Sequence, residues 1–68
     1  MAISYNKLWK LLIDRGLNKT GLRDAVGISN GTLAKLGKNE PVALAVLEKI
    51  CEVLGCQFGD IIEYIPKG

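Results

Sequence analysis

Two short helices and the turn between them are encoded by the stretch NKTGLRDAVGISNGTLAKL, residues 18–36. Asn18 offers a side-chain oxygen to cap the first helix, and Gly27 can close it because glycine accepts the left-handed conformation at a helix end. Ser29 can cap the next helix after a turn of only three residues. Apolar side chains can then meet across the turn: Leu22, Ala25 and Val26 with Leu33 and Leu36. The stretch predicts a helix-turn-helix.

The same start and stop signals recur along the rest of the chain. Each start has an apolar residue, a cap residue, three further residues and a second apolar residue, which is the arrangement of an N-cap with a hydrophobic staple. It occurs in full at Ile3-Ser4, Leu17-Asn18 and Ile28-Ser29, and with poorer caps at Val42-Ala43 and Cys56-Gln57. Helix stops are expected at Gly16, Gly27, Gly37 and Gly55. These signals predict five helices near residues 5–15, 19–26, 30–36, 44–54 and 58–64, with Pro66 ending the last.

Apolar residues within the expected helices repeat at steps of three and four, as one face of a helix does. The stripe of the fourth helix consists of Leu44, Leu47, Cys51 and Leu54. Trp9 and Tyr5 of the first helix are expected in the core and at its rim, in preference to a role as stacking platforms for DNA bases. With 68 residues, 49% hydrophobic and 24% charged, the chain fits one globular domain. We therefore predict an all-α fold, a compact five-helix bundle, in a single domain over 1–68 with the helix-turn-helix at 19–36.

The spacing of the central motif resembles that of the Xre/Cro-type helix-turn-helix family, which is related to the lambda-repressor DNA-binding domains. The residues that carry this resemblance are Leu22, Gly27, Ile28, Ser29, Leu33 and Leu36. The stretch from Lys38 to Ile62 resembles the end of the family's small stand-alone members. The resemblance implies a lambda-repressor-like five-helix bundle. Arg23 departs from it, because the family more often has alanine there, and the sequence leaves open whether Arg23 packs or contacts DNA.

Composition and motifs give no support to catalysis. The chain has no histidine, no nucleophile–base pair and no glycine-rich phosphate loop. Cys51 and Cys56 do not form a CxxC motif and are expected to be small core residues. We predict no catalytic residue, no metal site, no cofactor and no small-molecule ligand. No apolar run reaches the roughly 20 residues of a membrane span, no signal peptide is evident, and two cysteines are typical of a reducing cytoplasm, so we expect a cytoplasmic protein.

Charge is divided unevenly along the chain, although the formal net charge is only +2. Residues 1–38 contain seven Lys and Arg against two Asp, a balance of +5, whereas residues 39–68 contain two Lys against five acidic residues, a balance of −3. Such an asymmetry is typical of a chain whose basic part faces a polyanion. Together with the helix-turn-helix, it indicates double-stranded DNA as the partner.

The exposed face of the third helix is expected to read bases, since Leu33 and Leu36 should point inward. Asn30 is the first candidate, because its amide can bond adenine at N6 and N7 together. Lys35 can reach guanine or a phosphate, and Ala34 can touch a thymine methyl group. Gly31 allows close approach of the backbone. The candidate base-reading residues are Ser29, Asn30, Gly31, Ala34 and Lys35.

Phosphate contacts are expected on either side of this face. Lys19 and Thr20 lie at the start of the second helix, where free N–H groups and the helix dipole favour an anion. The hydroxyl group of Thr32 lies near the groove edge. Lys38 and Asn39 follow the third helix and can reach the opposite strand. Such contacts fix the register on DNA without reading its sequence.

We interpret the chain as a sequence-specific, double-stranded-DNA-binding transcriptional regulator of bacterial or phage type, such as a repressor. The alternative is a protein-interaction module, for example an antitoxin or co-regulator that binds a partner protein through the acidic C-terminal half. A homodimer would suit paired half-sites. The apolar residues that either form such a dimer contact or close the core are Phe58, Ile61, Ile62, Tyr64 and Ile65.

Overall fold

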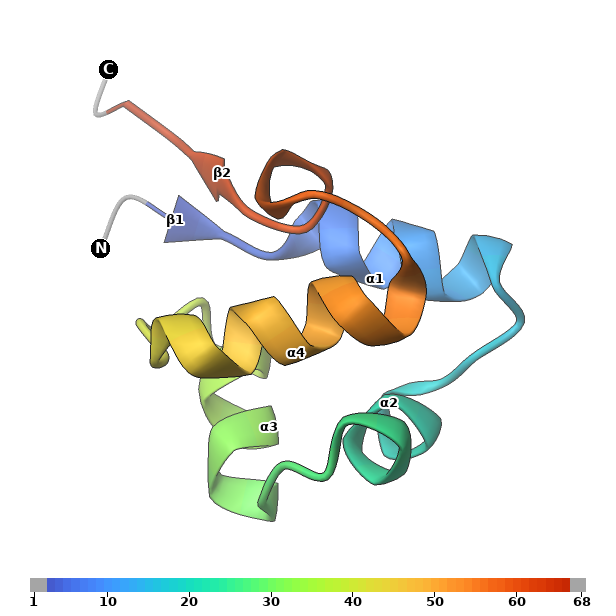
Figure 1. Cartoon of the computed structure of the whole chain (residues 1–68). Coiled ribbons are helices and arrows are strands. Elements are labelled where there is room, and N and C mark those ends of the chain that lie inside the picture. Colours follow the sequence, from blue (N-terminus) through green and yellow to red (C-terminus); the bar gives the residue numbers. More distant parts are fainter. Residues whose placement is uncertain (1–2, 67–68) are drawn as a thin grey trace.

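The structure, a computed structural model, describes residues 3–66. Helices α2 and α3 lie at one end of the molecule, the two strands lie at the other, and α4 runs between them (Figure 1). The elements in chain order are β1 (Ile3–Ser4), α1 (Asn6–Asp14), α2 (Lys19–Val26), α3 (Asn30–Gly37), α4 (Leu44–Leu54), the 3-10 turn η1 (Phe58–Asp60) and β2 (Glu63–Tyr64). The first four predicted helices are confirmed, with ends that differ by at most one residue.

The predicted fifth helix at 58–64 is wrong. Only the single turn η1 forms there, and the chain then leaves it to build β2. This strand pairs antiparallel with β1, with Ile3 opposite Tyr64 and Ser4 opposite Glu63. The physical reason lies in the sequence IIEYI at 61–65, because isoleucine and tyrosine favour the extended chain. The predicted all-α class is therefore supported, because the fold is mostly helical, but it has four helices and a small two-stranded sheet instead of five helices.

The start of α1 also differs from the prediction. Ser4 belongs to β1 instead of capping the helix, and Tyr5 occupies the N-cap position without a side-chain bond to the first helical turn. The Ser4 hydroxyl still accepts a hydrogen bond from the Asn6 N–H at 3.1 Å. The paired strand thus takes the residue that local spacing assigned to the cap, because the partner strand comes from the far end of the chain.

One apolar core joins all four helices. Its fully enclosed members come from α1, α2, α3, α4 and the segment after η1, and the largest are Tyr5, Leu8, Leu22, Leu36, Ile50 and Ile61. Cys51 and Cys56 are half-buried free thiols packed against this core, in agreement with the expected role. Two predicted core residues are exposed instead: Leu44, at 71% of its surface, and Ala25. Both lie on helix faces that no other element covers.

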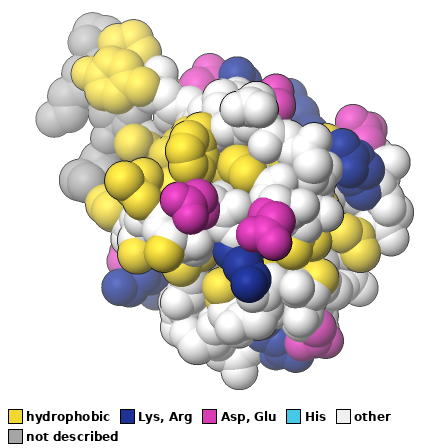
Figure 2. All heavy atoms as spheres, viewed as in Figure 1, with side chains coloured by type: hydrophobic (Ala, Val, Ile, Leu, Met, Phe, Trp, Pro, Cys, Tyr) yellow, Lys and Arg dark blue, Asp and Glu magenta, His cyan; other side chains and the backbone are white. Residues whose placement is uncertain are grey.

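Large apolar side chains remain exposed on α4 and on the C-terminal segment. Figure 2 shows apolar side chains gathered between α4 and the strands, with acidic groups among them. Of the five residues considered for a dimer contact, Ile61 is fully buried in the core and Ile62 is half-buried. Phe58, Tyr64 and Ile65 are exposed by 43%, 71% and 47%. Ile61 therefore closes the core, whereas a dimer contact through the exposed residues stays a prediction.

Within residues 3–66, no helix has the length and apolar character required to cross a bilayer. The four α-helices have at most 11 residues each.

Candidate nucleic-acid interface

Helices α2 and α3 form the predicted helix-turn-helix, and each begins at the cap that the sequence indicates. The Asn18 side-chain oxygen accepts a hydrogen bond from the Gly21 N–H at 2.7 Å. The Ser29 hydroxyl accepts one from the Thr32 N–H at 3.1 Å. Each cap satisfies a backbone donor that the first turn of a helix leaves free. A side-chain carbon added at Gly21 would lie 3.2 Å from the Asn18 oxygen, which explains the glycine next to this cap.

The turn between α2 and α3 is closed by backbone bonds to one carbonyl group. The N–H groups of Gly27 and Ile28 donate to the carbonyl of Arg23 at 2.8 and 3.2 Å. Gly27 has a φ of 78°, in the left-handed region that residues with a side chain rarely adopt. Leu22 and Leu36 are fully buried on the two sides of the turn. The relative orientation of the helices is thus fixed by the turn and by the core beneath it.

The outward face of α3 is open to solvent. All five residues predicted to read bases are exposed: Ser29, Asn30, Gly31, Ala34 and Lys35. Leu36 is buried on the opposite face, while Leu33 is only half-buried. An exposed polar stripe over a buried apolar one is the arrangement that a helix needs to enter a groove while remaining attached to its domain.

The residues predicted to contact phosphate lie around this helix, and they differ in exposure and in the hydrogen bonds that they already make. Lys19, Thr20 and Lys38 are exposed. Thr32 is half-buried, and its hydroxyl lies 3.1 Å from that of Ser29. The side-chain oxygen of Asn39 accepts a hydrogen bond from the Tyr5 N–H at 3.0 Å, so that only its NH2 group remains for a phosphate.

The ammonium group of Lys19 lies 4.6 Å from the centre of the Trp9 ring. This is a cation–π distance, and it ties the start of α2 to α1. Trp9 is half-buried and packs against the core, whereas Tyr5 is fully buried within it. Trp9 and Lys19 lie in different helices, so no local sequence pattern predicts this contact.

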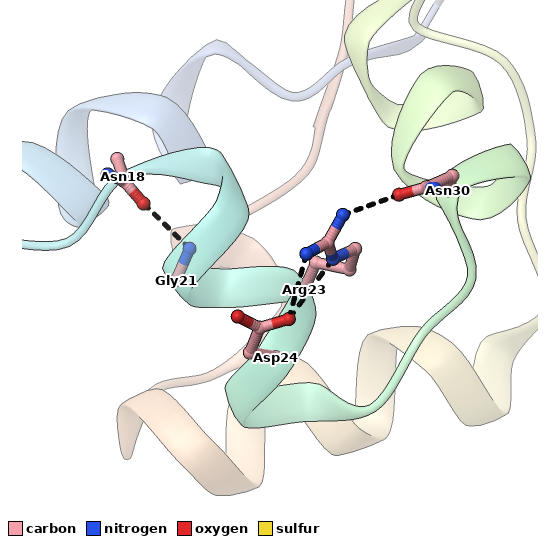
Figure 3. A network of polar contacts seen from close by, with 5 residues as sticks. All are labelled: Asn18, Gly21, Arg23, Asp24 and Asn30. Carbon is pink, nitrogen blue, oxygen red and sulfur yellow. Dashed lines mark hydrogen bonds and ion pairs between the residues drawn. The ribbon is translucent and has the colours of Figure 1, made fainter.

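Arg23 occupies the space between the two helices of the motif (Figure 3). Its Nη1 donates to the Asn30 side-chain oxygen at 2.7 Å. Its Nε and Nη2 both donate to one oxygen of Asp24, at 3.1 and 3.0 Å. The sequence left the role of Arg23 open, and the structure places it in contact with the first candidate for base reading. Arg23 and Asn30 are seven residues apart on opposite sides of a turn, and no motif or periodicity in the sequence indicates that they make contact.

Two basic residues in the first half of the chain bind backbone carbonyl groups away from the α2–α3 motif. Arg15 donates from Nη1 to the Leu54 carbonyl at 2.6 Å, near the end of α4. Lys7 donates to the Gly59 carbonyl at 3.1 Å. Cations next to free carbonyl groups at a helix end are stabilising. The basic residues of the first half of the chain are therefore distributed between the α2–α3 motif and the region near the end of α4 and η1.

No group of three Cys, Asp or Glu side chains that could hold a metal ion exists within residues 3–66. The exposed polar face of α3, the capped helix starts and the cations beside them suit an extended anionic partner instead. The family model of the Cro/C1-type HTH DNA-binding domain matches residues 7–67. The chain belongs to the Cro/C1-type helix-turn-helix family. This confirms the family that the sequence motif indicated.

Two relatives extend the comparison for this Cro/C1-type chain. A protein of Bacillus subtilis (strain 168), named as the uncharacterized HTH-type transcriptional regulator YozG, is 43% identical over 66 residues, which cover 94% of this chain and 77% of that protein. The crystal structure of the transcriptional regulator VanUg superimposes with a TM-score of 0.94 at 65% identity, over 97% of this chain and 88% of that one. A Cro/C1-type transcriptional regulator is thus supported, and the alternative of a protein-interaction module is not favoured.

Proposed function

We propose that this chain is a sequence-specific, double-stranded-DNA-binding transcriptional regulator in which α3 enters the major groove. The observation that carries the proposal is the exposed polar face of α3 above a buried apolar one, held by the Ser29 cap and the Gly27 turn. A major groove about 12 Å wide admits such a helix. In this proposal residues 1–68 act as one DNA-binding domain, with the helix-turn-helix at 19–36.

The proposed interface makes two kinds of contact with DNA, one with base edges and one with phosphates. Asn30, Ala34 and Lys35 face the base edges, with Ser29 and Gly31 close to them at the start of the helix. Residues beside the groove hold the phosphates: Lys19, Thr20, Thr32, Lys38 and Asn39. Phosphate contacts supply salt-dependent affinity, whereas base contacts supply the sequence preference.

A first experiment locates the surface. DNA is titrated into the labelled protein while backbone amide resonances are followed. Residues 18–20 and 29–39 should shift together. If the largest shifts fall on α1 or α4 instead, the interface is assigned to the wrong helices.

A second experiment separates base reading from phosphate binding. Asn30→Ala should cost about 1–3 kcal/mol mainly at one base pair, whereas Lys38→Ala should weaken all DNA about equally and reduce the salt slope by about 1. Binding is measured on a selected site and on random DNA at several salt concentrations. Equal losses on both DNAs for Asn30→Ala would contradict base reading by this residue.

We further propose that two copies bind paired half-sites through the exposed apolar residues of the C-terminal segment. Tyr64 belongs to β2, which lies at the end of the molecule remote from α2 and α3 (Figure 1), so a contact through this strand leaves both reading helices uncovered. Sedimentation at micromolar concentration tests this, with Tyr64→Lys expected to give a monomer. A wild-type protein that sediments as a monomer both free and on DNA would exclude the dimer.

A further inference from the structure

The contact between Arg23 and Asn30 fixes which end of the Asn30 side-chain amide faces α2. A guanidinium group has five N–H donors and no acceptor, so the atom that it contacts must be an acceptor. The contact of 2.7 Å is with Asn30 Oδ1, which sets the side-chain NH2 group on the other end of the amide. The orientation of this amide therefore follows from chemistry.

Asp24 holds the guanidinium group in place for this contact. One Asp24 oxygen accepts from both Nε and Nη2 of Arg23, which leaves Nη1 directed to Asn30. The three side chains form a chain of bonds from α2 to the first residue of α3 (Figure 3). Because Arg23 is the middle member, its removal releases the Asn30 amide without altering Asn30 itself.

An amide held in this way offers donors to a DNA base. Bidentate recognition of adenine needs both ends of the amide, since Oδ1 must accept from N6 while Nδ2 donates to N7. Arg23 occupies one of the two lone pairs of Oδ1 and turns this oxygen toward α2, so the Nδ2 group is the end of the amide left to meet a base edge that presents only acceptors. Guanine presents two neighbouring acceptors, O6 and N7, in the major groove. The positive charge of Arg23 beside Asn30 favours the same electronegative edge.

We propose that Arg23 is a positioning residue that sets the specificity of Asn30 for guanine in place of the adenine expected from the sequence. This inference rests on the proposed function, because it assumes that α3 lies in the major groove. It assigns to Arg23 an effect on which base is preferred at one position, separate from the affinity that any positive charge adds.

The first test uses the free protein and requires no DNA. The two Nδ2 proton resonances of Asn30 are compared in the wild type, Arg23→Ala and Lys38→Ala. Loss of the guanidinium group should shift the Asn30 side-chain resonances, whereas loss of the Lys38 charge should leave them in place. Unchanged Asn30 resonances in Arg23→Ala, in a protein that circular dichroism shows to be folded, would overturn the inference.

The second test selects bound fragments from random DNA with the wild type and three variants. The wild type should prefer guanine by about tenfold or more at one position that Asn30→Ala no longer distinguishes. Arg23→Ala should lose this preference or change it to adenine, with the rest of the motif kept. Arg23→Lys should do the same while it retains the wild-type salt dependence, because its single ammonium group cannot replace the fork of the guanidinium.

The outcomes separate the two proposals. The role of Arg23 is overturned if Arg23→Ala still selects guanine at this position. It is also overturned if the wild type selects adenine at the position that Asn30→Ala no longer distinguishes. Either result leaves the proposed function standing. Failure of the wild type to select any motif overturns the proposed function, and this inference with it.

Discussion

The hydroxyl group of Tyr5 donates a hydrogen bond to the backbone carbonyl of Glu40, 2.8 Å away and 35 residues further along the chain. Tyr5 is fully buried, and burial raises the pKa of its hydroxyl group above the ordinary value. Its own N–H donates to Asn39, the residue before Glu40. The start of α1 therefore holds the loop that leaves the proposed reading helix.

We predict that Tyr5→Phe lowers the free energy of unfolding by about 1–2 kcal/mol, because the Glu40 carbonyl loses its partner in a partly buried place. Urea unfolding followed by circular dichroism measures the change. Tyr64→Phe, studied at a protein concentration that keeps the chain monomeric, is the matched comparison, since the Tyr64 side chain is 71% exposed within one chain, and it should change stability much less. Equal effects of the two substitutions would show that the buried bond adds nothing specific.

Two glycines at the ends of α2 and α3 should respond in opposite ways to alanine. Gly27 has a φ of 78°, so Gly27→Ala should destabilise the fold by about 1 kcal/mol or more. Gly37 lies within α3 without a positive φ, and an added side-chain carbon would meet no atom within 4 Å. Gly37→Ala should therefore stabilise the protein by about 0.5–1 kcal/mol. Thermal unfolding of both variants checks the signs, and a loss of stability in Gly37→Ala would be inconsistent with this geometry.

The Cys56 thiol should make stability depend on pH in the alkaline range. Burial, and next the neighbouring Cys51 thiol, raise the pKa of Cys56 to about 11. The unfolded chain releases this proton nearer its ordinary pKa of about 8.5. Ionisation thus favours the unfolded state between these values, so the contribution is complete below about pH 8.5 and is lost as the pH rises to about 11.

Unfolding free energies of the wild type and Cys56→Ala from pH 7 to 11 test this point. The wild type should lose more stability over the range, and Tyr5, which ionises in both proteins, cancels in the comparison. Absorbance of the thiolate in the folded wild type gives a direct check. Parallel stability curves for the two proteins would mean that the Cys56 pKa is alike in the folded and unfolded states.

The contact of Lys19 with Trp9 provides a reporter of DNA binding, because Trp9 is the single tryptophan of the chain. If a phosphate binds at the start of α2, the Lys19 ammonium group turns from the ring to the phosphate, and Trp9 emission changes. Lys19→Met should alter the emission of the free protein, remove most of the response to DNA and reduce the salt slope of binding by about 1. Lys10→Met is the charge-matched control on α1. A full fluorescence response in Lys19→Met would argue against a phosphate contact by this residue.

Local signals predicted the four helices well because each depends on neighbours in the chain. Asn18 and Ser29 cap the helices that they precede, and Gly27 and Gly55 close α2 and α4 in the left-handed conformation. The stop expected at Gly37 is instead provided by Asn39, with a φ of 57°. Asparagine tolerates this conformation through its short polar side chain, and its oxygen is held by Tyr5.

The C-terminal segment shows where local signals fail. Cys56-Gln57 and Ile61 have the spacing of a helix start, yet only η1 forms. Lys7 from α1 binds the Gly59 carbonyl, and β1 pairs with β2. These partners lie some 50 to 60 residues away in the chain, beyond the range of any cap or periodicity argument. Once β1 is present, the isoleucines of 61–65 gain more from extension than from another helical turn.

By itself, the sequence determined the helix-turn-helix, its family and the exposed face of α3, because caps, glycine turns and apolar spacing act between residues a few positions apart. Only the tertiary structure decided that residues 63–64 form a strand rather than part of a helix, that Lys19 lies over the Trp9 ring and that Arg23 binds Asn30. Each of these depends on side chains or strands that meet across a turn or across the whole domain. Local sequence patterns do not predict such pairs because their members are distant in the chain, and they meet only when the shared core packs.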